Sequence, residues 1–176
     1  MHEGQLVYWS ARASGVAYFV AVVLAGRRGR GGRSDVAVRT AWTVACGLLV
    51  AHEILAIALS FGWSQSLAWR RIAEQTLDVT GVDFGGGLVV NYVTAIVWTA
   101  DVAWWWIGPA SHAARPRWID VSLWTLLAAM FFFGAVVFAD GWTRTAAAAM
   151  FAVAGIWLVA CARQRPERTI GCSAST

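Results

Sequence analysis

Five long apolar stretches dominate this 176-residue chain and constrain its fold more than any motif. A bilayer core about 30 Å thick requires roughly 20 mostly apolar residues in an α-helix, and five segments meet that length. We therefore predict an all-α integral membrane protein, a single membrane domain over 1–176 with five transmembrane helices. The predicted spans are residues 5–26, 40–62, 88–108, 119–139 and 145–162.

The first span has the weakest apolar signal of the five, because Arg12 and Ser14 interrupt its apolar run. A charged side chain at bilayer depth is costly unless it has a partner or a function. The alternative topology has four transmembrane helices, with the first helix lying at the membrane interface.

Composition supports a membrane location. Hydrophobic residues make up 59% of the chain and charged residues 14%, whereas soluble domains carry roughly 25% charged residues. This balance argues against a cytosolic globular enzyme, and the apolar content excludes a disordered chain. The chain has no lysine and is rich in Ala, Arg, Val and Trp, which is typical of GC-rich bacterial genomes. We expect a bacterial inner-membrane protein.

The arginines predict the orientation of the spans. Ten of the fourteen fall on one side, in the loop 27–39, the loop between the third and fourth spans, and the tail 163–176. Positive side chains are retained in the cytoplasm, so we predict an external N-terminus and a cytoplasmic C-terminus. We interpret the basic loop as lying near lipid headgroups, and we expect no nucleic-acid partner.

Tryptophan fits the same topology, since nine of the twelve fall near predicted span ends. An indole ring prefers the membrane interface because it is apolar but carries one hydrogen-bond donor. The nine are Trp9, Trp63, Trp69 and Trp142 at outer ends and Trp42, Trp104, Trp105, Trp106 and Trp118 at inner ends.

The outer loop 63–87 carries a periodic apolar pattern. Its spacing from Trp69 to Thr80 is helical and predicts a short helix on the outer surface at about 66–80. Arg70 and Glu74, four residues apart, are predicted to pair on it. The following Gly85–Gly87 predicts a turn.

Six polar residues inside the predicted spans are the candidate functional residues. On the third span Asn91, Thr94 and Asp101 fall along one face, and on the second span Glu53 shares a face with Thr43, Cys46 and Ser60, so we expect the two faces to meet. The six are Arg12, His52, Glu53, Asn91, Thr94 and Asp101. At 1.5 Å per residue, Arg12 and Glu53 both lie roughly 20 Å from the inner ends of their spans. This common depth predicts an ion pair between them.

These residues allow two interpretations of function. We expect a non-enzymatic protein, a subunit of a larger membrane assembly, in which the polar residues hold the helices together. The alternative is a small transporter or a proton or ion conduit that uses Glu53, Asp101 and His52. Loss of ion flux in Glu53→Gln would distinguish the conduit. An intramembrane enzyme is a third interpretation, for which no substrate is indicated.

Motifs for catalysis, metals and cofactors are missing from the sequence. His52 is the only histidine inside a predicted span, and Ala56 stands where a zinc-protease HExxH motif needs its second histidine. We predict no catalytic residue, no metal site and no cofactor. His112, in an inner loop, is expected to be solvated. The expected partners are the lipid bilayer and other membrane subunits or a second copy of this chain.

Overall fold

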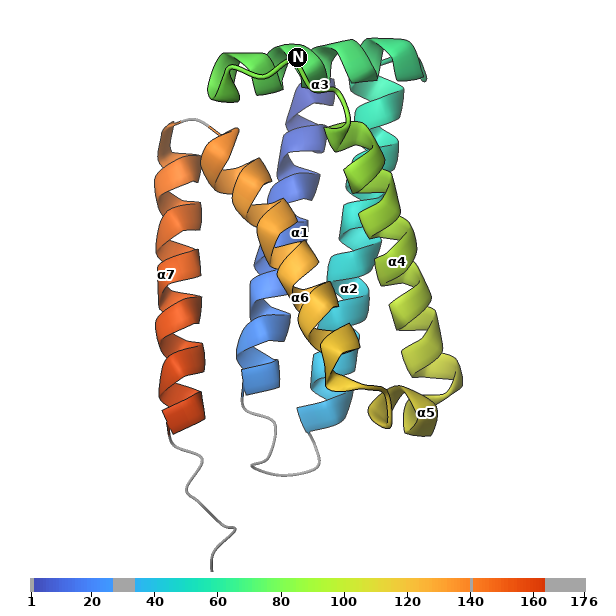
Figure 1. Ribbon diagram of the computed structural model, residues 1–176. Coiled ribbons are helices and arrows are strands. Elements are labelled where there is room, and N and C mark those ends of the chain that lie inside the picture. The colour runs from blue at the N-terminus through green and yellow to red at the C-terminus, as the bar shows by residue number, and fades with distance from the viewer. Residues whose placement is uncertain (1, 27–33, 140, 164–176) are drawn as a thin grey trace, which may run out of the picture.

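The computed structural model describes residues 2–26, 34–139 and 141–163, and within these ranges the chain is helical and contains no strand. Five helices are long and apolar enough to cross a membrane, which suggests a multi-pass membrane protein. They run side by side as an elongated bundle (Figure 1). The elements are α1 His2–Gly26, α2 Ser34–Leu55, η1 Ala56–Ser60, α3 Gln65–Thr80, α4 Gly87–Ile107, α5 Pro109–Ala113, α6 Arg117–Phe132, η2 Phe133–Val137 and α7 Gly141–Arg163.

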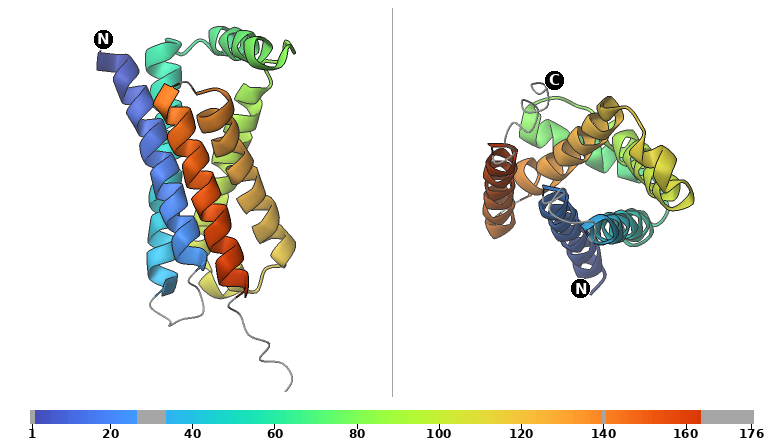
Figure 2. Two further views of the ribbon diagram at one scale, coloured as in Figure 1. Left: turned by 90° about the vertical axis from the view of Figure 1, so that its left-hand side faces the viewer. Right: turned by 90° about the horizontal axis from the view of Figure 1, so that it is seen from below.

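The first helix belongs to the bundle. α1 runs antiparallel to α2 along its length, whereas α3 lies across the end of the bundle (Figures 1 and 2). This arrangement fits five spans better than the alternative with an interfacial first helix. We call the end of the bundle that carries α3 the α3 end, and the opposite end the α5 end.

The helix α3 closely matches the surface helix predicted at 66–80. It starts at Ser64, whose hydroxyl accepts a hydrogen bond from the Leu67 amide, and it ends at Gly81 with a positive φ of 76°. A serine at the N-cap and a glycine with positive φ at the C-cap are both common at helix ends. The predicted Arg70–Glu74 pair is wrong: Glu74 pairs with Arg71 at 3.4 Å, since a neighbour three residues away reaches equally well.

An aromatic cluster fills the middle of the bundle. The Trp42 ring lies 4.1 Å from Trp124 and 5.0 Å from Trp98, measured between centroids. Tyr18 stacks on Phe131 at 4.8 Å. The interpretation of Trp42 as an interface residue is wrong, because α2 begins at Ser34 rather than near residue 40, and Trp42 therefore lies two turns inside the helix with 1% of its surface exposed.

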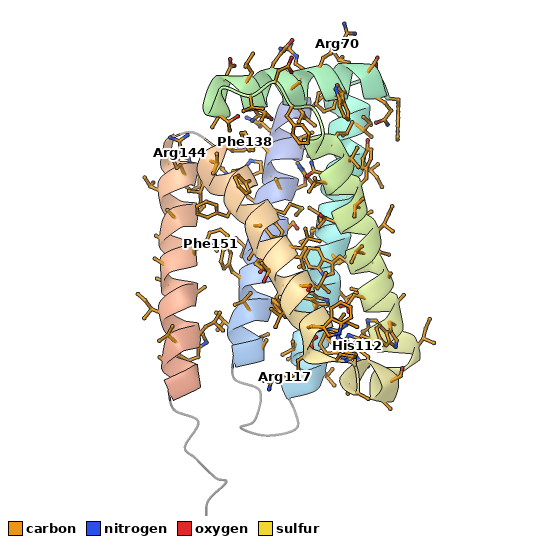
Figure 3. All side chains as sticks on the ribbon, viewed as in Figure 1. Arg70, His112, Arg117, Phe138, Arg144 and Phe151 are labelled. Carbon is orange, nitrogen blue, oxygen red and sulfur yellow. The ribbon has the colours of Figure 1, made fainter. Side chains whose placement is uncertain are left out.

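A cavity near the α3 end is lined by residues of α1, α2, η1, α4, α6, η2 and α7. α7 stands at one edge of the bundle, beside α1 and away from α4 (Figures 1 and 2). Both α2 and α6 end in a π-helical turn at this end, η1 and η2. In Figure 3, Phe138 and Arg144 mark the α3 end of this region and His112 marks the opposite end of the molecule.

Candidate functional site

The six candidate residues do not form a single site. Four of them, from α1, α2 and α4, line one cavity of about 630 Å³ near the α3 end: Arg12, His52, Glu53 and Asn91. Asp101 belongs to a polar cluster at the α5 end. Thr94 is buried and its hydroxyl donates to the Val90 carbonyl of its own helix at 2.7 Å, so it is satisfied locally.

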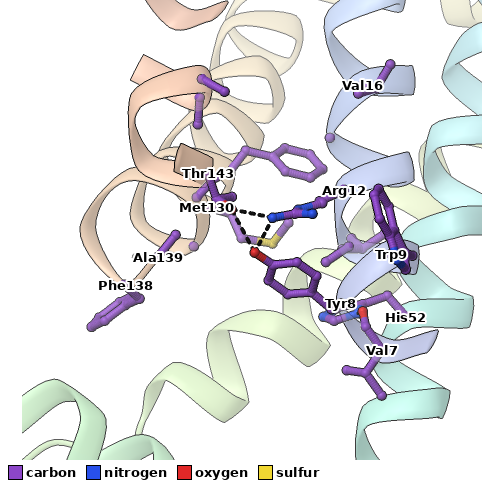
Figure 4. Close-up of a pocket in the computed structure, with 18 of the residues that line it drawn as sticks. Val7, Tyr8, Trp9, Arg12, Val16, His52, Met130, Phe138, Ala139 and Thr143 are labelled. Carbon is purple, nitrogen blue, oxygen red and sulfur yellow. Dashed lines mark hydrogen bonds between the residues drawn. The ribbon is translucent and has the colours of Figure 1, made fainter. Parts of the chain in front are cut away.

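The rest of the cavity wall is mostly apolar. It is formed by α1, the end of α2, the η2 region and the start of α7 (Figure 4). The polar side chains are thus few and gathered in one enclosure, which is the usual composition of a small-molecule site. Apolar and aromatic lining residues include Val16, Phe19, Leu49, Met130, Phe131, Phe138, Trp142, Ala147 and Met150.

The Arg12 guanidinium is held in place by residues of the cavity wall. Its Nη2 donates to the hydroxyls of Tyr8 and Thr143 (Figure 4). Its central carbon lies 3.6 Å from the Tyr8 ring centroid and 4.2 Å from that of Trp142, within the range of cation–π attraction. The buried Nε has no hydrogen-bond partner in the described part of the chain. The cation is therefore positioned without being neutralised.

The predicted Arg12–Glu53 ion pair is wrong. Ser10 and Ser14 of α1 contact α2, through His52 Nδ1 at 3.2 Å and the Ala45 carbonyl at 3.0 Å respectively. Arg12 is two residues from each of them, which rotates it by about 200° around the helix. Arg12 consequently faces α7. The ion-pair prediction failed because it compared only depths along the two helices and ignored the direction of each side chain around its helix axis.

His52 and Glu53 differ in how they are held. His52 Nδ1 donates to the Val7 carbonyl at 3.0 Å, which fixes its ring against α1. Glu53 Oε1 is buried and has no hydrogen-bond partner among the described residues. The cavity thus contains a second ionisable side chain, with a polar atom that has no partner in the described part of the chain.

Asp101 organises the polar cluster at the α5 end. Its carboxylate accepts hydrogen bonds from Trp42 Nε1 at 2.8 Å, from His112 Nε2 at 3.2 Å and from Arg115. Arg115 also binds Asp120. The Asp101, His112 and Arg115 side chains are each 5–6% exposed, so this is a buried and largely satisfied network that ties α2, α4, α5 and the start of α6 together.

The prediction that His112 is solvated is wrong. Its ring stacks on Trp105 with centroids 4.7 Å apart, because α5 folds back against the end of α4. Burial and the neighbouring Arg115 guanidinium lower the pKa of His112, against the smaller opposing effect of Asp101. At neutral pH the imidazole is therefore uncharged and donates to Asp101 as a neutral ring.

The expectation that the polar faces of the second and third spans meet agrees with the contacts between α2 and α4. Besides Trp42 and Asp101, Cys46 Sγ lies 3.6 Å from Thr99 Oγ1. The aromatic cluster, however, lies between the cavity polar groups and Asp101. His52 and Glu53 are thus not joined to Asp101 in a single polar site.

Sequence reasoning missed the residues that hold Arg12. Tyr8 lies four residues before Arg12, a helical spacing that could have suggested the contact. Thr143 is 131 residues away in sequence and gave no signal. Among the described residues, no group of three His, Cys, Asp or Glu side chains could hold a metal ion.

Comparison with known proteins gives no further indication of function: no family model, no curated protein and no solved structure matches this chain.

Proposed function

We propose that this chain is a non-enzymatic multi-pass membrane protein that binds an amphipathic small molecule in the cavity near the α3 end. The observation that carries the proposal is the cavity itself, about 630 Å³ in volume, with mostly apolar walls and a few polar side chains that include Arg12, His52, Glu53 and Asn91. Its volume lies within the roughly 300–1,000 Å³ of sites that enclose drug-sized ligands. A ligand with both a polar and an apolar part would match this lining.

The backbone around the cavity supports a binding role. Two π-helical turns contribute to its wall, η1 through Ser60 and η2 through Gly134 and Ala135. π-Helical turns are rare and occur frequently at functional sites. A Cβ added at Gly134 would meet no atom within 4 Å, so the absence of a side chain there keeps space open inside the wall.

The arrangement favours binding over conduction. A conduit through Glu53, His52 and Asp101 needs polar groups between the cavity and the α5 end. The side chains packed there are aromatic, including Tyr18, Trp42 and Trp98. The conduit interpretation predicts loss of proton flux in Glu53→Gln liposomes, whereas the binding interpretation predicts no flux in either protein.

We further propose that the protein lies in the bacterial inner membrane with its α3 end outside and its C-terminus in the cytoplasm. The arginine distribution along the sequence supports this orientation. The lipid bilayer and other membrane subunits are the partners that its exposed apolar helix faces would contact. The two single-cysteine variants are made in a cysteine-free version of the protein and expressed in intact cells. A membrane-impermeant maleimide should label Gln75→Cys and not Ala110→Cys. The reverse labelling would contradict the orientation.

Photolabelling tests the binding proposal. The probe is a twelve-carbon alcohol with a diazirine near its methyl end, added to the purified protein in phosphatidylcholine nanodiscs. We expect saturable labelling of Met130 and Met150, which line the cavity, displaced by excess unlabelled dodecanol. Labelling confined to lipid-facing side chains such as Val153 and Ile156, without saturation, would contradict it.

A matched pair of glycine variants makes the photolabelling specific. Gly134 and Gly155 are both helical, and a Cβ at either position meets no atom within 4 Å. Only Gly134 lines the cavity. Gly134→Phe should therefore reduce labelling several-fold, while Gly155→Phe should label as the unmodified protein does.

A further inference from the structure

We infer that the ligand of this cavity is a single-chain amphiphile with one carboxylate, and that Arg12 binds its anionic head. This inference rests on the proposed binding function and names the chemical class of the ligand. It depends on three features of the site: the state of Arg12, the direction of the apolar wall, and the charge balance.

Arg12 is a prepared anion site. Tyr8 and Thr143 accept hydrogen bonds from one terminal nitrogen and fix the plane of the guanidinium, and Trp142 covers it. The Nε–H remains without an acceptor, and no carboxylate lies within 4.0 Å among the described residues. A fixed guanidinium without a carboxylate partner matches a planar carboxylate, to which it forms charge-assisted hydrogen bonds.

A buried arginine at the α5 end shows the contrast. Arg115 is bound by two carboxylates, Asp101 and Asp120, and needs no further anion. Within the described residues, Arg12 is held by neutral hydroxyls and aromatic rings and by no carboxylate. A cation at bilayer depth without an anion is costly, and an anionic ligand would remove that cost.

An apolar wall extends from Arg12 into the bundle. On α1 the cavity continues from Arg12 to Phe19, a distance of about 10 Å at 1.5 Å per residue. Met130 and Phe131 of α6 line the side of the cavity opposite α1, and Met150 of α7 also lines the cavity. Flexible methionine side chains adapt to an alkyl chain, so the hydrocarbon part of the ligand would lie here, with its head at Arg12.

The charge of Arg12 favours a monoanion, since one cation balances one carboxylate. Glu53 also lines the cavity, and its buried Oε1 has no partner in the described part of the chain. It provides the alternative that the experiment must separate: a cationic amphiphile bound by Glu53. Arg12 is favoured because four aromatic or hydroxyl groups of the wall position it, at Tyr8, Trp9, Trp142 and Thr143, whereas no hydrogen bond holds Glu53 Oε1.

Competition against the diazirine alcohol tests the inference, with twelve-carbon competitors that differ only in the head. We expect dodecanoate at pH 8.5 to displace the probe at a concentration at least tenfold lower than dodecanol. The ratio of the displacing concentration of dodecanol to that of dodecanoate should fall to about one in Arg12→Gln. In Arg12→Lys it should fall only in part. Arg70→Gln, an exposed arginine at the same end, should leave it unchanged.

Each result has a distinct meaning. Equal displacement by dodecanoate and dodecanol would overturn the inference while leaving the proposed binding function intact. Absence of saturable labelling in the unmodified protein would overturn both. Strongest displacement by dodecylammonium, lost in Glu53→Gln, would assign the site to cations. Stronger displacement by dodecyl phosphate, or by a two-chain phosphatidic acid, would overturn the single-chain carboxylate. Retained labelling of Arg12→Gln by the neutral probe shows that the variant is folded.

Discussion

Trp42 donates its indole N–H to the Asp101 carboxylate at 2.8 Å and so joins α2 to α4 inside the bundle. The same carboxylate accepts from His112 and Arg115, which join α5 and the loop before α6. One acidic residue therefore links α2, α4, α5 and the loop that leads into α6. This role accounts for Asp101 without any ion path, and it can be tested separately from the cavity.

Trp42 and Trp98 form a matched pair for measuring the bond to Asp101. Both are buried in the same aromatic cluster, but Trp98 Nε1 has no partner in the described part of the chain. Trp42→Phe should destabilise the protein by about 1–3 kcal/mol more than Trp98→Phe, because only the former removes a hydrogen bond to a charged group. Reversible unfolding in detergent measures the difference. Equal losses would show that the bond contributes nothing.

Arg115→Gln should be strongly destabilising. The change removes the cation between Asp101 and Asp120 and leaves a buried carboxylate less compensated, a loss of about 3–5 kcal/mol for a broken buried pair. Arg71→Gln breaks the exposed pair with Glu74 and should cost about 0–1 kcal/mol. Thermal unfolding of both variants provides the comparison. Similar melting temperatures would contradict the buried network.

His112 should make stability depend on pH. Its pKa in the folded protein lies below the ordinary 6.5, so below that pH the unfolded chain binds a proton that the folded chain resists. Its stabilising contribution is therefore complete above pH 6.5 and decreases as the pH falls. The melting temperature should drop between pH 7.5 and 5.5, and His112→Gln should flatten this slope. An unchanged slope in the variant would assign the effect to other groups.

Gly85 should be required for α3 to dock on the bundle. A Cβ at this position would lie 2.5 Å from Trp69 Nε1, so Gly85→Ala should cost about 1–3 kcal/mol by overpacking. Gly47→Ala is the control, since its Cβ meets no atom within 4 Å. Limited proteolysis near α3 and thermal unfolding report the change. Gly85→Ala combined with Trp69→Ala should lose less than the sum of the two single losses, and a purely additive loss would contradict the contact.

The helices were predictable because their signals are local. Long apolar runs predicted the five bundle helices. Apolar residues at helical spacing, followed by glycines, predicted α3. The depths of Arg12 and Glu53 could also be estimated from residue counts. Each of these inferences needs only neighbours within one segment of sequence.

The site was less predictable because its contacts join distant segments. Arg12 turns toward Thr143, 131 residues away, and depth alone could not reveal which side of α1 it occupies. His112 is buried because the short α5 folds back on α4, bringing its ring to Asp101 across eleven residues. The positions of polar residues were thus visible in the sequence, while the partners required the packing of the bundle.

The most direct test of the binding account is the small-molecule content of the purified protein. Protein isolated from its native membrane is washed in detergent, extracted with organic solvent and analysed by quantitative mass spectrometry, alongside Gly134→Phe and Gly155→Phe. The account predicts about one amphiphile per chain in the unmodified protein and in Gly155→Phe, and a several-fold loss in Gly134→Phe. Equal amounts in all three proteins, or none in any, would contradict it.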